Sequence, residues 1–397
     1  RVTDVVRNRE LVTSREQDVE PRSGHDVILT LDAGLQHIVE SELADAMQKF
    51  SPDGLCAIVV RPRTGEILSL ANLPTFDPNE AGAAPSENRR NRAISDTYEP
   101  GSTFKVVAVS GALNDGLIAL DTRFDCEGGR TFFAGKPLRD DHPSGILTVE
   151  DIIGKSSNIG TFKIALLLGA NRLDQYIRSY GFGSVARIPL AGEENGIVHP
   201  VKKWSKLSIS RIPIGQGIAV TPLQMAMAMS ALANRGRLMQ PMLIDRVLDE
   251  RGQVVAANQP RLVRQVISEA TAQLMTTALK SVVSTNGTAR KAMLDHYLVA
   301  GKTGTAQKPE KGGYLGKHVS SFVGFFPADN PELCITVVLD DPKPIYYASS
   351  TAVPIFRNIA ERAAQYLAIP PSPPSPPPTS SLAAHLAPDP GATRGKP

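Results

Sequence analysis

The sequence predicts a mixed α/β fold of the α+β kind, with one sheet assembled from segments near both ends and a helical subdomain inserted between them. Three observations carry this prediction. Hairpin patterns lie at residues 55–74 and 318–342, and amphipathic helical patterns lie beside them at 32–50 and 354–367. Between about residues 101 and 285 the chain is rich in helical patterns. A length of 397 residues suits one large domain or two ordinary ones.

The N-terminal part predicts a helix followed by a hairpin. Within residues 32–50, apolar side chains recur on one helix face, namely Leu35, Ile38, Val39, Leu43 and Met47. Asp32 is suited to cap this helix, because its carboxylate can accept hydrogen bonds from the free N–H groups of the first turn. In residues 55–74, two apolar runs flank "PRTGE", which is typical of a β-hairpin.

The C-terminal part predicts a second hairpin followed by a helix. Two apolar runs flank "PADNPE" within residues 318–342, and residues 354–367 return to helical periodicity. Residues 369–397 are rich in proline and poor in large apolar groups, so they cannot bury a core. We expect this last segment to be a disordered or polyproline tail.

Composition excludes several classes of function. Hydrophobic residues make up 42% and charged residues 21%, as in folded soluble proteins. The excess of basic over acidic residues is only 43 − 40 = 3, which does not favour nucleic acid or a membrane surface as the main partner. The sequence contains no run of about 18 apolar residues, the length that is needed to span a bilayer. The three cysteines form no CxxC pair, and we expect Cys56 and Cys334 to be core residues rather than disulfide or zinc ligands.

The first motif with chemical potential is "YEPGSTFK", in which Ser102 and Lys105 stand three residues apart after Pro100-Gly101. If a helix begins at Ser102, the two side chains share one face. A neutral lysine can then take the proton of the hydroxyl, and burial or a second cation would lower the lysine pKa enough for this. The alternative is a helix start with a solvated polar face, since the motif alone is common.

The second motif is "GKSSNIG", which holds Ser156, Ser157 and Asn158. Ser156 is a candidate for relaying a proton between Lys105 and a leaving amine. Asn158 offers both a donor and an acceptor to a peptide-like substrate. Taken alone, the motif is better explained as a capping cluster before the helical segment "IGTFKIALLLG".

The third motif is "AGKTGTAQK", with Lys302, Thr303, Gly304 and Thr305 after a strand-like run. Gly304 would remove a side chain where another backbone approaches, so that a peptide could pair along this edge. Lys302 would supply the second cation, and the threonine hydroxyls could hold a carboxylate. The alternative is a turn with a solvated lysine. The following segment, "QKPEKGGYLGKHVS", is expected to form a loop at the mouth of the cleft.

The order S-x-x-K, S-x-N, K-T-G is the signature set of penicillin-binding proteins and class A β-lactamases. From about residue 24 to 368 the chain resembles the transpeptidase domain of the monofunctional class B penicillin-binding proteins. Segments such as "GHDVILTLDAGLQHIVESEL", "VVRPRTGEILSLANLPTFDPN" and "IPIGQGIAVTPLQMAMAMSALANRG" are similar to that family in the same order. "YEPGSTFK" and "KSSNIG" look more like the septal branch than the elongation branch. The resemblance implies a fold shared with serine β-lactamases, with an antiparallel sheet and flanking helices.

The resemblance also implies a mechanism and a set of site residues. The stem peptide of peptidoglycan, ending in D-Ala-D-Ala, would acylate a serine, and an amine of a neighbouring stem would resolve the acyl-enzyme. The implied catalytic residues are Ser102, Lys105 and Ser156. The implied substrate-binding residues are Asn158, Lys302, Thr303, Gly304 and Thr305, and the oxyanion hole would be formed by the N–H groups of Ser102 and Thr305. No metal or organic cofactor is implied, and β-lactams would be covalent inhibitors.

The resemblance places the domain outside the cytoplasm, next to the inner membrane. A single N-terminal anchoring helix would hold it there, and this helix is not within the sequence. Residues 1–24 would be the remnant of a pedestal or linker, 25–368 the transpeptidase domain and 369–397 the tail. Expected partners are a SEDS-type glycosyltransferase and other divisome proteins.

Four alternatives stay open at this level. A serine β-lactamase shares the acylation residues but needs a deacylating group, and Glu194 lies at a suggestive distance without the expected Leu-Asn. A D,D-carboxypeptidase differs only in using water as acceptor. A non-catalytic β-lactam sensor or scaffold is a further possibility. Asp140, Asp141 and His142 would make a weak metal site, because adjacent ligands do not surround an ion well.

Overall fold

A computed structural model describes residues 3–4, 9–10, 23–310 and 313–372 of this protein. The expected linker remnant and Pro-rich tail therefore lie mostly outside the described residues. Within the described ranges, no helix combines the length and the apolar character needed to cross a membrane.

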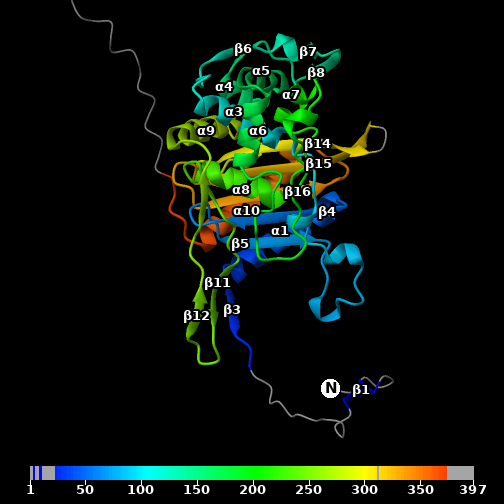
Figure 1. Cartoon of the computed structure of the whole chain (residues 1–397), viewed down its shortest axis with the longest axis vertical. Helices are drawn as coiled ribbons and strands as arrows, with labels where there is room; N and C mark the ends of the chain where they lie inside the picture. The colour runs from blue at the N-terminus through cyan, green and yellow to red at the C-terminus, as the bar shows by residue number, and fades with distance from the viewer. Residues whose placement is uncertain (1–2, 5–8, 11–22, 311–312, 373–397) are drawn as a thin grey trace, which may run out of the picture.

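A five-stranded antiparallel sheet forms the centre of the molecule (Figure 1). Its strands, in spatial order, are β14 (Ala300–Glu310), β15 (Gly313–Phe326), β16 (Leu333–Asp340), β4 (Gly54–Val60) and β5 (Ile67–Leu73). Both predicted hairpins are confirmed, since β4 pairs with β5 and β15 pairs with β16. The two ends of the chain meet where β16 pairs with β4. β14 and β5 are the two edge strands of this sheet.

Helices cover both faces of the sheet. The two predicted helices, α1 (Ala33–Phe50) and α10 (Ala352–Tyr366), pack against each other on one face, where the ring of Phe356 meets that of Phe322. Asp32 caps α1 by accepting from Leu35 N–H, as predicted. On the opposite face lies α8 (Pro222–Ala233), whose backbone accepts a weak hydrogen bond from buried Cys334.

A helical subdomain lies above the sheet in Figure 1. It consists of α3 (Lys105–Asn114), α4 (Val149–Gly154), α5 (Asn158–Leu168), α6 (Ala170–Ser179), α7 (Ser208–Arg211) and α9 (Glu269–Val282). A short helix α2 (Arg92–Ser95) precedes it. Two small hairpin-like pairs decorate it, β6 (Arg123–Asp125) with β9 (Ile146–Thr148) and β7 (Arg130–Phe133) with β8 (Lys136–Arg139). The inserted helical region is thus confirmed, although it carries strands that periodicity did not predict.

Three further small sheets complete the described structure. β10 (Arg237–Met239) pairs with β13 (Leu262–Gln265), β1 (Thr3–Asp4) pairs with β2 (Arg9–Glu10), and β11 (Ile244–Leu248) lies between β12 (Val254–Ala257) and β3 (Asp26–Leu29). The prediction of a loop directly after the third motif is wrong, because most of this segment forms strands. β14 runs on to Glu310 and β15 starts at Gly313, with Pro309 opposite Tyr314, because pairing the two segments satisfies backbone groups that a loop would leave to solvent.

Candidate active site

The first motif begins where two backbones touch. Gly101 opens a 3₁₀ turn, Gly101–Phe104, which leads directly into α3 at Lys105. Its φ of 56° is easily adopted only by glycine. A Cβ at Gly215 would lie 2.2 Å from the Gly101 carbonyl oxygen, so this second glycine lets another segment support the turn. The turn holds Ser102 half-buried at the N-terminal end of α3, while Lys105 is fully buried.

The structure brings the three motifs together around one hydroxyl. Lys105 Nζ donates to Ser156 Oγ at 3.1 Å and also to the Ser156 carbonyl. Lys302 Nζ donates to the same Ser156 Oγ at 2.9 Å. The hydroxyl that meets both lysines is therefore that of Ser156. Ser102 Oγ makes no hydrogen bond with any described residue, which leaves its lone pairs open for reaction.

Burial tunes the two lysines toward their neutral forms. Desolvation lowers the pKa of Lys105 to about 8, although the carboxylates of Asp140 and Asp141 oppose the shift. Burial also lowers the pKa of Lys302 well below its ordinary value, and the nearby charge of Lys105 adds to this effect. Two buried ammonium groups that donate to one half-buried hydroxyl cannot both keep their charge without a large cost in free energy. Burial therefore moves both amines toward the neutral form that a general base requires.

Ser156 is held in an unusual backbone conformation. Its φ of 61° lies in the left-handed region, which disfavours residues with a Cβ and tends to be retained at functional sites. Ser157 then caps α5, because its hydroxyl accepts from Gly160 N–H at 2.9 Å. The predicted capping cluster and the predicted site residues are thus the same segment. Asn158 begins α5, and its side-chain amide donates to the Arg139 carbonyl at 2.7 Å.

Asp140 organises the second motif, a role that the sequence did not indicate. Its Oδ1 accepts from the N–H groups of Asn158 (2.6 Å) and Ile159 (3.0 Å), and its Oδ2 accepts from Ser157 Oγ at 2.7 Å. The carboxylate thereby satisfies the free N–H groups at the start of α5. Nothing local in the sequence links Asp140 to residues that far along the chain. No cluster of three or more metal ligands forms among the described residues, and Asp140 is engaged in these hydrogen bonds.

The third motif lies on β14, at the sheet edge. Gly304 is required by a close approach, since a Cβ there would lie 2.5 Å from Ser321 Oγ and 2.8 Å from the Pro100 carbonyl oxygen. Thr303 Oγ1 shares a hydrogen bond of 3.0 Å with Thr288 Oγ1. Thr305 Oγ1 accepts from Ala348 N–H at 3.1 Å, so its own proton is free to donate elsewhere.

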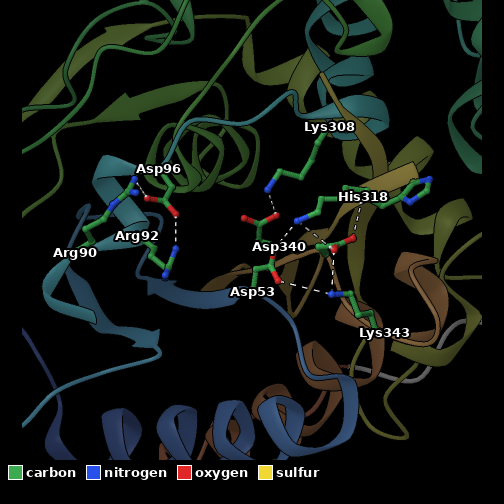
Figure 2. A network of polar contacts seen from close by, with 10 residues as sticks. Asp53, Arg90, Arg92, Asp96, Lys308, His318, Asp340 and Lys343 are labelled. Atoms are coloured by element: carbon green, nitrogen blue, oxygen red, sulfur yellow. Dashed lines mark hydrogen bonds and ion pairs between the residues drawn. The ribbon is translucent and has the colours of Figure 1, made fainter. Parts of the chain in front are cut away.

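Charged side chains flank a cavity at the far end of β14 (Figure 2). On one wall Asp96 pairs with Arg90 and, at 3.0 Å, with Arg92. On the other, Lys308 pairs with Asp340 at 2.6 Å. The cavity between these walls has a volume of about 460 Å³. Gln307 and Lys308 line it, so it lies at the end of the strand that carries the third motif.

Glu99 and Glu194 differ in their relation to the site. Glu99 lines the same cavity and accepts from Gly217 N–H at 2.8 Å, which ties the segment before Ser102 to a neighbouring loop. Glu194, the residue considered as a deacylating group, is exposed. Its backbone N–H donates to the Ile94 carbonyl. The arrangement favours acyl transfer from a peptide-like donor over hydrolysis directed by Glu194.

Comparison with known proteins gives consistent results. Residues 55–361 match the family model of the penicillin binding protein transpeptidase domain. The chain is 38% identical over 345 residues to stage V sporulation protein D of Bacillus subtilis, covering 85% of this chain and 53% of that protein. It is 34% identical over 356 residues to the probable peptidoglycan D,D-transpeptidase PenA of Neisseria gonorrhoeae, covering 89% and 59% respectively. The chain therefore spans little more than half the length of these relatives.

Solved structures are similar over most of the chain. Penicillin-binding protein 3 from Mycobacterium tuberculosis, complexed with ampicillin, superposes with a TM-score of 0.85 at 32% identity, covering 91% of this chain and 83% of that one. The transpeptidase domain of penicillin-binding protein 3 from Burkholderia pseudomallei gives a TM-score of 0.78, also at 32% identity, with coverages of 87% and 98%.

Proposed function

Because this chain belongs to the penicillin-binding protein transpeptidase family, as a class B member, we propose that it cross-links peptidoglycan stem peptides through an acyl-enzyme on Ser102. The observation that carries the proposal is the Ser156 hydroxyl, which accepts from both Lys105 and Lys302 beside the Ser102 turn. That arrangement supplies a base, a proton relay and a second amine that can donate hydrogen bonds to a substrate carboxylate.

In the acylation step, neutral Lys105 takes the proton of Ser102 Oγ as this oxygen attacks the carbonyl of the penultimate D-Ala. The tetrahedral oxyanion is stabilised by the backbone N–H groups of Ser102 and Thr305. When the C–N bond breaks, the proton on Lys105 passes through the Ser156 hydroxyl to the leaving amine, and free D-Ala departs. An ester on Ser102 remains.

In the second step, an amine of a neighbouring stem attacks this ester. Its proton returns along the same route, so that Ser102 regains its hydrogen when the ester C–O bond breaks. Asn158 orients the donor peptide. Thr303, Thr305 and the amine hydrogens of Lys302 hold the terminal carboxylate, and the free proton of the Thr305 hydroxyl supports this role.

The direct test is the intact mass of the protein after exposure to benzylpenicillin. A β-lactam carbonyl should acylate Ser102 and remain attached for many minutes, with the modified peptide located at that serine. Rapid turnover without an adduct would instead indicate a β-lactamase. A folded protein that does not react at all would indicate a scaffold. Product analysis with a stem pentapeptide and an amine acceptor separates transpeptidation from D,D-carboxypeptidation.

The segments "YEPGSTFK" and "KSSNIG" further support a role in septal wall synthesis. The transpeptidase domain would span residues 25–368 and act at the outer face of the inner membrane. A SEDS-type glycosyltransferase and divisome proteins would be its partners. Depletion in cells tests this assignment, since blocked division should give filaments. Rounded cells would indicate an elongation role instead.

A further inference from the structure

A groove lined by arginines lies apart from the active-site motifs. One cavity of about 470 Å³ lies between the end of α6 and the paired strands β10 and β13. A second cavity of about 410 Å³ shares Arg187, Gln240, Pro241 and Arg261 with it, so the two form a continuous groove. α6 and α8, which border the first cavity, are labelled in Figure 1.

The charge of this groove is entirely of one sign. Arg178, Arg187, Arg261 and Arg264 line it, and none of the described residues that line either cavity is acidic. This segregation is unexpected in a chain whose basic excess is only 3. Arg178 pairs with Asp174 at 3.0 Å. The other three form no ion pair with any described carboxylate.

The central arginine of the groove is held in place by its backbone. Arg187 has a φ of 66°, a left-handed conformation that disfavours side chains larger than glycine. Its N–H donates to the Glu193 carboxylate at 3.0 Å, and its carbonyl accepts from Gln240 Nε2 at 3.4 Å. Strained residues held by such bonds are often retained at binding sites. The Glu193 carboxylate thus accepts from the backbone N–H groups of Ala186 and Arg187 and forms no ion pair with the Arg187 guanidinium.

The remaining arginines and the floor are also positioned. Arg264 Nη1 donates to the Arg178 carbonyl at 3.2 Å, which ties β13 to the end of α6. Buried Tyr180, Met227 and Leu238 form a closed floor beneath the exposed guanidinium groups. All four cations are arginines rather than lysines, and the planar guanidinium fork matches the oxygens of a phosphate group.

We propose that this groove binds a phosphate-bearing anion, with Arg187 and Arg261 contacting it from both cavities. The paired cavities favour a ligand with more than one phosphate group or a phosphate on a larger molecule. Two sources share this chemistry, a soluble phosphate compound and the headgroup of an anionic phospholipid. The site does not depend on the proposed transpeptidase activity.

Isothermal titration calorimetry of the full chain with sodium pyrophosphate, and with inorganic phosphate, tests the proposal. Saturable binding that weakens as salt is raised is expected. The double variant R187Q/R261Q should bind about tenfold more weakly or worse, since it removes two charge-assisted contacts. The control R123Q/R251Q loses the same charge at exposed sites outside the groove, and its affinity should change by less than about twofold. Melting temperatures check that each variant is folded.

Sedimentation with vesicles separates the two sources. The site would be assigned to a lipid headgroup if the protein binds phosphatidylcholine vesicles that contain phosphatidylglycerol but does not bind pyrophosphate. R187Q/R261Q should then lose the binding to these vesicles. If the double variant does not fold, R261Q alone can replace it in these measurements, because the Arg261 side chain makes no hydrogen bond with any described residue. The proposal is overturned if no probe binds saturably. It is also overturned if the control R123Q/R251Q weakens binding as much as R187Q/R261Q does. A third contrary result would be binding of polyglutamate, a polyanion without phosphate, that pyrophosphate does not displace.

Discussion

At the scale of single residues, the site is governed by the competition of two buried lysines for one acceptor. Lys105 and Lys302 both donate to Ser156 Oγ, and burial lowers the pKa of each. A lysine in water would be protonated and unable to act as a base. The fold therefore makes the chemistry possible by excluding water from these amines, and the consequence can be measured as a pH dependence.

The rate of acylation by benzylpenicillin should rise with pH, reach half of its maximum near pH 8 and level off about one pH unit higher. The pKa of Lys105 is lowered to about 8, and only its neutral form accepts the Ser102 proton, so the reactive fraction grows as pH rises through this value. Stopped-flow measurement of the second-order rate constant checks this. Lys105→Ala should abolish acylation with little loss of thermal stability. A rate that is flat or falling between about pH 6 and 9 would contradict the role of Lys105 as base.

Removing the charge of Asp140 should move that pH profile to lower values. The Asp140 carboxylate raises the pKa of Lys105, so Asp140→Asn should lower the midpoint of the profile. It should also reduce the plateau rate, because Asn replaces one acceptor oxygen of the second motif with a donor.

Asp141→Asn is the matched control for this effect. Asp141 also raises the pKa of Lys105, yet it makes no recorded hydrogen bond to the second motif among the described residues. Its substitution should shift the midpoint and leave the plateau unchanged. Equal plateau losses in both variants would show that Asp140 has no positioning role.

At the scale of elements, local sequence patterns predicted the helices and hairpins whose formation depends on residues close together in the chain. The helices α1 and α10 and the hairpins β4–β5 and β15–β16 follow from periodicity and turn residues. The pairing of β3 with β11 depends on partners distant in sequence. The last residues of β14 pair with the nearby start of β15, and the Lys- and Gly-rich composition of this segment did not indicate strands.

The same division applies to the site. The family resemblance is confirmed, and the motif order pointed to Lys105, Ser156 and Lys302, whose side chains meet in the structure. The sharing of Ser156 by both lysines and the cap formed by Asp140 depend on the tertiary structure. Their roles in catalysis stay predictions until the variants above are measured.

Replacing Gly304 should separate two elements that carry the reaction. A Cβ at this position would lie within 3.0 Å of Ser321 Oγ, the Pro100 carbonyl and Thr103, so β14 must move away from the Ser102 turn. Gly304→Val should therefore slow acylation by about 100-fold, as misplacement by about 1 Å does elsewhere. Gly82→Val is the control, since a Cβ there meets nothing within 4 Å. An unchanged rate in Gly304→Val would mean that this contact does not position the nucleophile.

At the scale of the whole molecule, the site belongs to neither half alone. Ser102 and Ser156 come from the helical subdomain, and Lys302 comes from the sheet edge. The buried apolar residues of both halves form one continuous cluster, which reaches from Cys56 and Cys334 in the sheet to Cys126 beside α5. Such continuity favours cooperative unfolding over independent opening of one half.

Unfolding in urea should accordingly expose both halves at the same denaturant concentration. Trp204 is the single tryptophan and packs against the core in the inserted region, so its fluorescence follows that half. Pulsed alkylation with peptide mapping follows Cys56 and Cys334 in the sheet and Cys126 in the subdomain, since all three thiols are free and buried. Two-state behaviour requires one midpoint for all four probes. If Trp204 and Cys126 respond at lower urea than the sheet cysteines, the subdomain opens by itself and the shared core is not the source of cooperativity.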